Sequence, residues 1–201
     1  MNSKIVILMG MSGCGKDKIR TILEEDYGYE NIVTYTSRPM RENELYGIDY
    51  YFISKKEFKD MINNNEMIEY RNYETNLYGN VDTWFYGVKK FELQDNTNYV
   101  IVIDLIGAEN IINYFGKENC IPIYITANDD IREKRAKERG SFDKAEWDRR
   151  LIADYKDFSF TKLQNFIIKN KIWKIENNIR GEFALTEIAN VIDFIRQGRL
   201  Y

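Results

Sequence analysis

A glycine-rich segment near the start of the chain carries the clearest chemistry. It reads Gly10-Met11-Ser12-Gly13-Cys14-Gly15-Lys16-Asp17, follows the apolar run 5–9 and leads into a helical pattern over 16–27. In such a strand, loop and helix, backbone N–H groups and the helix N-terminus attract phosphate, and Lys16 can reach the β- and γ-phosphates as a catalytic group. The residues that we expect to contact the phosphates of ATP are Gly10, Ser12, Gly13, Cys14, Gly15, Lys16, Asp17 and Lys18.

The last position of this loop departs from the GxxxxGK(S/T) pattern, because Asp17 stands where a hydroxyl normally binds magnesium. A carboxylate about 4 Å from a phosphate charge is repelled by roughly 4 kcal/mol at an effective dielectric of 20. A bridging Mg²⁺ would reverse this argument, since a hard cation favours carboxylate oxygen, and Lys18 could offset the added charge. Two interpretations stay open: Asp17 is an unusual direct or water-mediated magnesium ligand, or it marks impaired triphosphate chemistry.

A second group of polar residues lies between positions 34 and 80. Arg38 and Arg41 are three residues apart, so both guanidinium groups could converge on one phosphate. Glu69 could accept hydrogen bonds from guanine N1–H and the 2-amino group, a pairing that adenine cannot reproduce at N1. The alternative is that these residues form ordinary surface ion pairs. Further hydroxyl donors to the phosphate are expected from Thr34, Tyr50 and Tyr78.

In this region the chain resembles the guanylate kinase family, whose pattern is roughly TTRxxRxGExxG.DY.F.S, then a Glu in the next strand, then YG(T/S). The resemblance implies transfer of the γ-phosphoryl group of ATP to GMP or dGMP, with Mg²⁺ and with Arg38 among the catalytic residues. Asn43 replaces a family glycine, and Asn80 replaces the Thr or Ser that faces guanine O6, although its amide could still donate there. The expected GMP-binding residues are Thr34, Arg38, Arg41, Tyr50, Glu69, Tyr78, Asn80 and Asp104.

Three further segments resemble the same family. Asp104 follows the apolar run 99–103, and ligands gather at such strand ends, so its carboxylate could face magnesium or the guanine amino group, or could cap a helix. With Asp17, it is an expected metal ligand. Arg135 and Arg139 share a helix face, near Arg132, and could stabilise the transferred phosphoryl group. The resemblance adds Arg150 to these catalytic arginines and places Asn170 near the adenine.

The elements that must position these groups follow from the hydrophobic pattern. Short apolar runs at 5–9, 99–103, 121–125 and 166–168 predict buried parallel strands, and they alternate with helical patterns over 16–27, 129–139, 147–158 and 182–199. Strands are also expected at 50–53 and 67–70, with a capping box opening a helix at 54–57. The pattern favours an α/β fold, and the resemblance implies the three-layer P-loop NTPase fold with a parallel central sheet, an α+β insertion and a helical lid.

The expected organisation is one P-loop core with two inserted parts. The core comprises 1–34, 96–127 and 159–201, the GMP-binding insertion 35–95, and the lid 128–158. The insertion and the lid are expected to close over the substrates and exclude water.

The amino-acid composition argues against several classes of protein. The 201 residues carry a net charge of -3 with 29 basic and 32 acidic side chains, so a nucleic-acid partner is not expected. The absence of histidine excludes His-based triads, and two cysteines, Cys14 and Cys120, are expected as free thiols in a reducing compartment. No apolar run suggests a membrane segment, so a cytoplasmic monomer or homodimer is expected. Two alternatives stay open: a guanylate-kinase-like binding module without catalysis, and a kinase for another (deoxy)nucleoside monophosphate.

Overall fold

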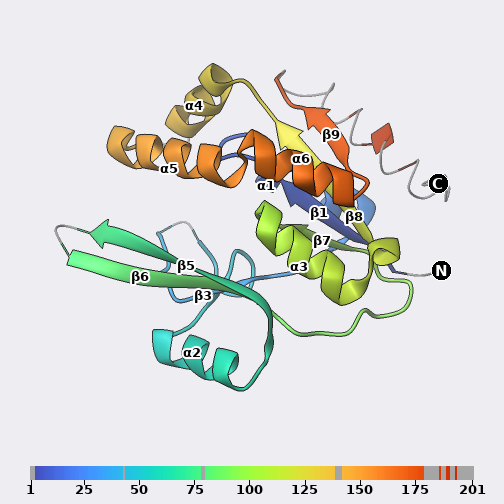
Figure 1. Ribbon diagram of the computed structural model, residues 1–201, viewed down its shortest axis with the longest axis horizontal. Coiled ribbons are helices and arrows are strands. Elements are labelled where there is room, and N and C mark those ends of the chain that lie inside the picture. The colour runs from blue at the N-terminus through green and yellow to red at the C-terminus, as the bar shows by residue number, and fades with distance from the viewer. Residues whose placement is uncertain are drawn as a thin grey trace.

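The central element is a parallel sheet, which lies in the upper half of the molecule in Figure 1. The computed structural model describes residues 3–42, 44–77, 80–138 and 142–178, together with 186, 189, 190 and 193. All pairings in this sheet are parallel, and the strand order is β2-β7-β1-β8-β9. Its strands are β1 (Ile5–Met9), β2 (Glu30–Asn31), β7 (Tyr99–Val102), β8 (Cys120–Thr126) and β9 (Trp173–Glu176).

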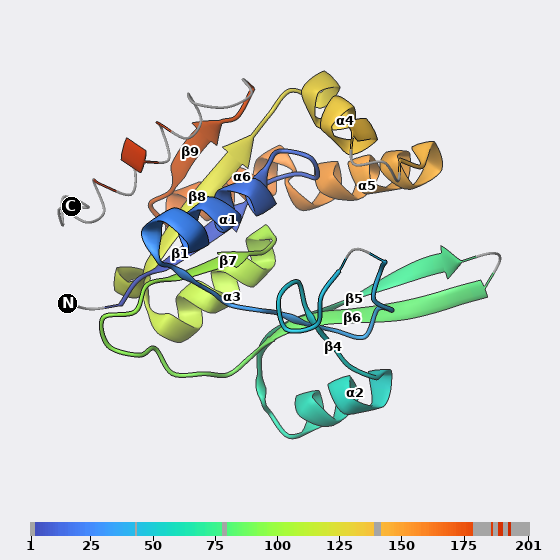
Figure 2. The ribbon, with the colours of Figure 1, turned by 180° about the vertical axis from the view of Figure 1, so that it is seen from behind.

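Helices cover both faces of this sheet, which explains why its strands are apolar throughout. Figure 2 shows α1 (Lys16–Tyr27) in front of the sheet, while α3 (Leu105–Phe115) and α6 (Phe160–Lys169) lie behind it. Within β1, Ile5, Ile7 and Met9 pack in the cluster that contains α3 and Phe166 of α6, whereas Val6 and Leu8 pack with α1. The three-layer α/β arrangement predicted from the sequence is confirmed.

A second, mixed sheet of four strands lies below the first (Figure 1). Its order is β4-β3-β6-β5, with β3 and β4 parallel and the other pairs antiparallel. The strands are β3 (Tyr35–Thr36), β4 (Tyr51–Phe52), β5 (Met67–Leu77) and β6 (Asn80–Lys89). Helix α2 (Lys55–Asn63) covers this sheet and begins at the predicted capping box between Ser54 and Glu57.

Two more helices project from the carboxyl end of β8. They are α4 (Asp129–Glu138) and α5 (Lys144–Asp157), and Figure 1 shows them above the β5–β6 hairpin. A short 3₁₀ turn, η1 (Lys117–Asn119), connects α3 to β8. Across the described part of the chain, no helix has the length and apolar composition that a bilayer crossing requires.

One predicted strand is wrong. The run 166–168 belongs to helix α6, where Phe166 is buried but Ile168 is 79% exposed. A three-residue apolar run fits either element, so periodicity could not decide between them. The fifth strand is instead β9, whose alternating pattern buries Ile175. Of the helix predicted at 182–199, residues 186, 189, 190 and 193 are described and are helical, and the rest lies outside the described residues.

Candidate active site

The phosphate loop between β1 and α1 is held in shape by close backbone contacts. Gly13 has a φ of 78°, and a Cβ there would lie 2.7 Å from the carbonyl oxygen of Arg132 on α4. Lys16 folds back across the loop, where its Nζ donates to the carbonyl oxygens of Gly10 at 2.8 Å and Met11 at 3.0 Å. The lysine is therefore held over the loop that the sequence predicts to bind phosphate.

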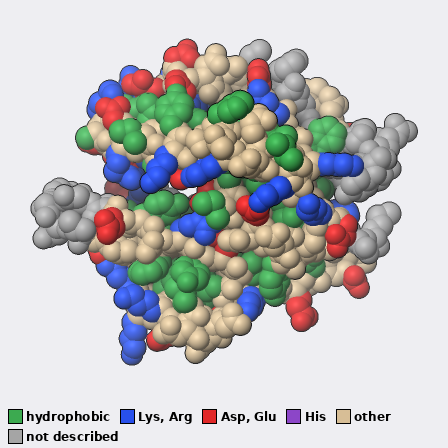
Figure 3. Space-filling model, in the orientation of Figure 1, with side chains coloured by type: hydrophobic (Ala, Val, Ile, Leu, Met, Phe, Trp, Pro, Cys, Tyr) green, Lys and Arg blue, Asp and Glu red, His purple; other side chains and the backbone are tan. Residues whose placement is uncertain are grey.

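Two adjoining cavities lie beside this loop. Figure 3, in the orientation of Figure 1, shows Lys and Arg side chains gathered across the middle of the molecule. The first has a volume of about 850 Å³ and contains Asp17 in its lining. The second, of about 410 Å³, extends toward the second sheet and is lined by Thr34, Arg38, Glu69 and Asp104. Some residues line both cavities. They come from the phosphate loop and the start of α1, from the segment between β3 and β4, and from α5: Ser12, Lys16, Arg41, Glu44, Tyr50, Glu146 and Arg150.

The arginine pair beside the second cavity is organised by Glu44. The guanidinium of Arg38 is buried and donates to both carboxylate oxygens of Glu44, at 2.9 and 2.6 Å. The backbone N–H of Arg41 donates to the same carboxylate at 2.8 Å. Burial raises the pKa of Glu44, but the hydrogen bonds from Arg38 and Arg41 outweigh it and leave this pKa below its usual value. Glu44 thus fixes the side chain of Arg38 and the backbone of Arg41, a role that its place in the motif did not reveal.

Tyr50 completes this part of the site. The guanidinium carbon of Arg38 lies 5.4 Å from the centre of its ring. Burial is the main reason that the pKa of Tyr50 rises to about 12, so its hydroxyl stays protonated and can donate a hydrogen bond. The structure therefore brings Arg38, Arg41, Thr34 and Tyr50 to one cavity, and their binding of a phosphate stays a prediction.

A third group lies deeper, where β5 faces the start of α3. Glu69 is 6% exposed, and its Oε2 lies 3.1 Å from Nη1 of Arg71. Burial raises the pKa of Glu69 to about 7, with Arg71 lowering it and Asp104 raising it further. Arg71 and Tyr73, which the sequence reading passed over, line the same cavity. Alternation along a strand starting from Glu69 would have found both.

Asp104 has two roles in this geometry. It is the N-cap residue of α3, and its Oδ1 accepts from the backbone N–H of Gly107 at 2.7 Å. Its Oδ2 accepts from the hydroxyl of Tyr73 at 3.4 Å. Asp17 and Asp104, the two expected metal ligands, line different cavities, and the described residues contain no cluster of three or more side chains suited to bind a metal.

The family model for guanylate kinase matches residues 2–180. The chain belongs to the guanylate kinase family. The guanylate kinase of Mycoplasma mobile is 33% identical over 95% of this chain and 92% of that protein, and the guanylate kinase of Mesoplasma florum is 28% identical over 94% and 69%. The crystal structure of guanylate kinase from Anaplasma phagocytophilum has the same fold, with a TM-score of 0.61 at 22% identity, covering 99% of this chain and 87% of that one.

In this member of the guanylate kinase family, the helices α4 and α5 bear directly on the phosphate loop. Arg132 is 1% exposed and donates to the carbonyl oxygen of Ser12 at 3.1 Å, with Asp154 of α5 at 3.3 Å. The carboxylate of Asp154 also accepts from the backbone N–H of Ser12 at 2.7 Å. The sequence placed Arg132 only on a nearby surface, and it did not identify Asp154.

Two of the arginines predicted for the lid, Arg135 and Arg150, lie at different places. Arg135 lies behind the loop, with its Nη2 2.8 Å from the carbonyl oxygen of Asn177 and its Nη1 3.4 Å from that of Cys14. Arg150 lines both cavities and is paired with Glu146 at 2.8 Å. Three predicted site residues lie outside what the structure describes, namely Tyr78, Arg139 and the side chain of Asn80.

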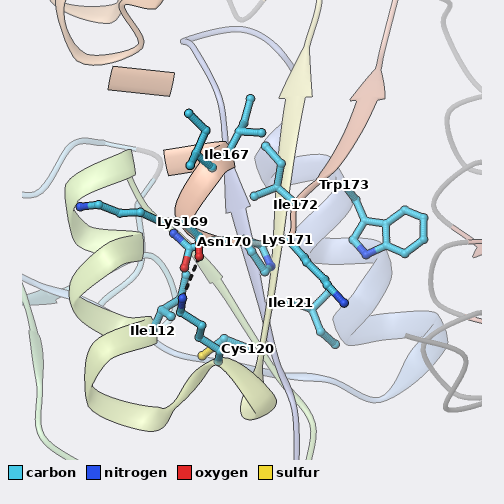
Figure 4. A pocket seen from close by; sticks show the side chains of 12 residues that line it. Ile112, Cys120, Ile121, Ile167, Lys169, Asn170, Lys171, Ile172 and Trp173 are labelled. Carbon is cyan, nitrogen blue, oxygen red and sulfur yellow. Dashed lines mark hydrogen bonds between the residues drawn. The ribbon is translucent and has the colours of Figure 1, made fainter. Parts of the chain in front are cut away.

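Asn170 does not join this site. It ends α6 and lines a separate cavity of about 580 Å³ together with Cys120 and Ile121, at the amino end of β8 (Figure 4). The phosphate loop follows the opposite, carboxyl end of the parallel sheet, so the placement near adenine is wrong. Asn177, just after β9, lies at the same end of the sheet as the phosphate loop, and its Nδ2 donates to the carbonyl oxygen of Cys14 at 2.8 Å. Misplacing the last strand caused this error.

Lys18 also lies apart from the cavities. Its side chain is exposed at the start of α1, and it appears in the lining of neither cavity. The remaining predicted loop residues surround Lys16, with Ser12, Gly13, Gly15 and Asp17 lining the first cavity.

Proposed function

We propose that this chain is a guanylate kinase, which transfers the γ-phosphoryl group of ATP to GMP and gives ADP and GDP. The observation that carries this proposal is the pair of adjoining cavities, which share Ser12, Lys16 and Arg150 between the phosphate loop and the arginine nest. Phosphoryl transfer requires the donor and acceptor phosphates to meet in line, and catalysis comes mainly from alignment and charge stabilisation.

The roles follow from the positions. Lys16 would bind the β- and γ-phosphates of ATP, while Arg38, Arg41 and Tyr50 would hold the phosphate of GMP. Arg150, which lines both cavities, would stabilise the charge on the group in transfer. Arg135 contacts the backbone of the phosphate loop and would support it from behind.

Magnesium fits the donor side of this arrangement. Asp17 is the second residue of α1 and contributes a hard carboxylate oxygen to the first cavity, next to Lys16. When bound, Mg²⁺ would neutralise charge on the β- and γ-phosphate oxygens. Asp17 would hold the ion directly or through water.

The decisive experiment measures ADP release with Mg-ATP across GMP, dGMP, AMP, UMP and dTMP. We expect GMP or dGMP to give the highest kcat/KM, because Glu69 can accept from guanine N1–H. Higher kcat/KM with UMP or dTMP would overturn the assignment in favour of another nucleoside-monophosphate kinase. Binding of GMP by calorimetry without any ADP release would indicate a nucleotide-binding module.

A second candidate function is a nucleotide-binding module with impaired catalysis, and the presence of Asp17 in the phosphate loop favours it. Asp17→Ser restores the usual hydroxyl and distinguishes the active kinase from this module. For the active kinase with Asp17 as magnesium ligand, we expect kcat to stay equal or to fall, together with weaker activation by Mg²⁺. A rise in kcat of roughly 100-fold or more, the scale of several kcal/mol of removed repulsion, would identify the impaired module instead.

A further inference from the structure

Arg71 occupies a position in the second cavity that no predicted role explains. It lies two residues beyond Glu69 on β5, and strand alternation puts the two side chains on the same face. Its guanidinium lies between two carboxylates, with Nη1 3.1 Å from Oε2 of Glu69 and Nη2 3.6 Å from Oδ1 of Asp104. All three residues line the cavity that also contains the arginine nest.

The guanidinium of Arg71 has hydrogen-bonding capacity left over. Nη1 donates to the carbonyl oxygen of Tyr70 at 2.8 Å, but Nε and Nη2 are buried and have no hydrogen-bond partner among the described residues. The same holds for Oε2 of Glu69. Nε and Nη2 form one edge of the planar guanidinium, so they present two donors side by side. Leaving buried charged groups unsatisfied is costly, which points to a ligand that supplies the missing partners.

We propose that Arg71 is a specificity-determining residue for the acceptor base, donating its free edge to the exocyclic carbonyl oxygen of a ring whose adjacent N–H is accepted by Glu69. This inference rests on the proposed guanylate kinase function and deepens it. An acceptor and a donor side by side complement the lactam group of a base, in which an N–H adjoins a C=O. In guanine these atoms are N1–H and O6. Adenine has no hydrogen on N1 for Glu69 to accept.

The same geometry implies that the guanine 2-amino group contributes little to the selection of the base. Both oxygens of Asp104 already face donors, since Oδ1 accepts from Gly107 and lies near Arg71, and Oδ2 accepts from Tyr73. Glu69 is therefore the main acceptor left for the base. IMP retains the lactam group of GMP and lacks the 2-amino group, so it should be a good substrate of this enzyme.

The test compares four acceptors, GMP, IMP, AMP and 6-thio-GMP, with the wild-type enzyme and Arg71→Met. For the wild type, we expect kcat/KM for IMP within about 10-fold of that for GMP, and AMP far below both. Arg71→Met should lower kcat/KM for GMP by roughly 10- to 100-fold, the scale of a lost hydrogen bond to a charged group. Sulfur accepts hydrogen bonds weakly, so the loss from GMP to 6-thio-GMP should be large in the wild type and small in Arg71→Met.

Control variants keep this test independent of folding. Arg71→Met leaves Glu69 without its cation, so Glu69→Gln/Arg71→Met is tested beside it, and both are compared with the wild type in urea unfolding. Lys174→Gln, at an exposed position on β9, is the matched surface control and should leave all four acceptors unchanged. If the double variant is folded, the GMP to 6-thio-GMP ratio should be small in it too.

The outcomes separate the two proposals. The role of Arg71 would be overturned if the loss of kcat/KM from GMP to 6-thio-GMP were equal in wild type and Arg71→Met. It would also be overturned if kcat/KM for IMP were more than about 1000-fold below that for GMP. Either result would leave guanylate kinase activity intact. A wild-type enzyme that phosphorylates none of the four acceptors would contradict the proposed function instead. In that case calorimetric binding of GMP and IMP to the same variants still tests Arg71.

Discussion

The two ends of the active site are completed in different ways. At the phosphate loop, Lys16 donates to Gly10 and Met11, and Ser12 is bound by both Arg132 and Asp154. Among the described residues there, Nε of Arg132 is the one buried side-chain atom without a hydrogen-bond partner. At the other end, Glu69 is buried and Arg71 is half-buried beside it, and both have buried side-chain atoms without hydrogen-bond partners among the described residues. For the proposed function, this contrast implies a phosphate site that is largely formed in advance and a base site that a ligand completes.

This difference has a physical origin. A phosphate loop binds through backbone N–H groups, which the surrounding elements hold in place whether or not an anion is present. A base is read through side-chain donors and acceptors, which must match the ligand atom by atom, so buried groups stay unsatisfied until the matching base arrives. Loss of a residue at the first end should therefore affect the rate or the fold, and at the second end the choice of substrate.

The largest expected effect is that of Lys16→Met. Removing this positive charge from the phosphate loop should lower kcat for GMP by roughly 1000-fold, the scale of one charge-stabilising group in a transition state. Binding of GMP, measured by calorimetry, should change by less than about threefold, because Glu69 and Arg71 belong to the other end. A kcat within tenfold of wild type would show that the two ends are not divided in this way.

The next effect concerns stability at the phosphate end. Asp154→Ala removes a carboxylate from the buried guanidinium of Arg132, whose other carboxylate partner, Asp129, is 57% exposed. Asp129 stays 2.8 Å from Arg132, so the loss comes from one of two charge pairs and from the N–H of Ser12, which is left without its acceptor. The free energy of unfolding in urea should therefore fall by about 2 kcal/mol. Arg132→Met/Asp154→Ala removes both charges and should recover part of the loss. Additive effects of the two substitutions would refute the internal pairing of this end.

The sequence predicted the phosphate end better than the base end. Strand β1, the loop and α1 are contiguous, so apolar continuity and glycine spacing were sufficient to locate Lys16. Asn170 was misplaced because a short apolar run before it is compatible with either a strand or a helix. Strand alternation from Glu69 could have placed Arg71 on the same face, but not its contact with Asp104, which is distant in the sequence and is brought close by the packing of α3 near β5.

The smallest effect, and the one that belongs to the base end alone, is a pH dependence from Glu69. Its pKa is raised from 4.5 to about 7, so the folded protein keeps this proton in a range where the unfolded chain has released it. Stability due to this group is therefore greatest below pH 4.5 and declines as pH rises toward 7. The free energy of unfolding of Glu69→Gln should lack this decline, and urea unfolding of both proteins between pH 5 and 8, compared as a difference, measures it.

The same titration should appear in substrate selection. The ionised carboxylate is the better acceptor for guanine N1–H, so kcat/KM for GMP should rise about tenfold as pH increases through about 7, near the pKa of Glu69. Arg71 lowers that pKa, and Asp104 raises it, so Arg71→Met should shift the rise to higher pH and Asp104→Asn to lower pH. Lys16→Met should leave the midpoint unchanged while reducing the rate. If Lys16→Met moved the midpoint as far as Arg71→Met does, the two ends would be electrostatically one site, and the division between a prebuilt phosphate end and a ligand-completed base end would fail.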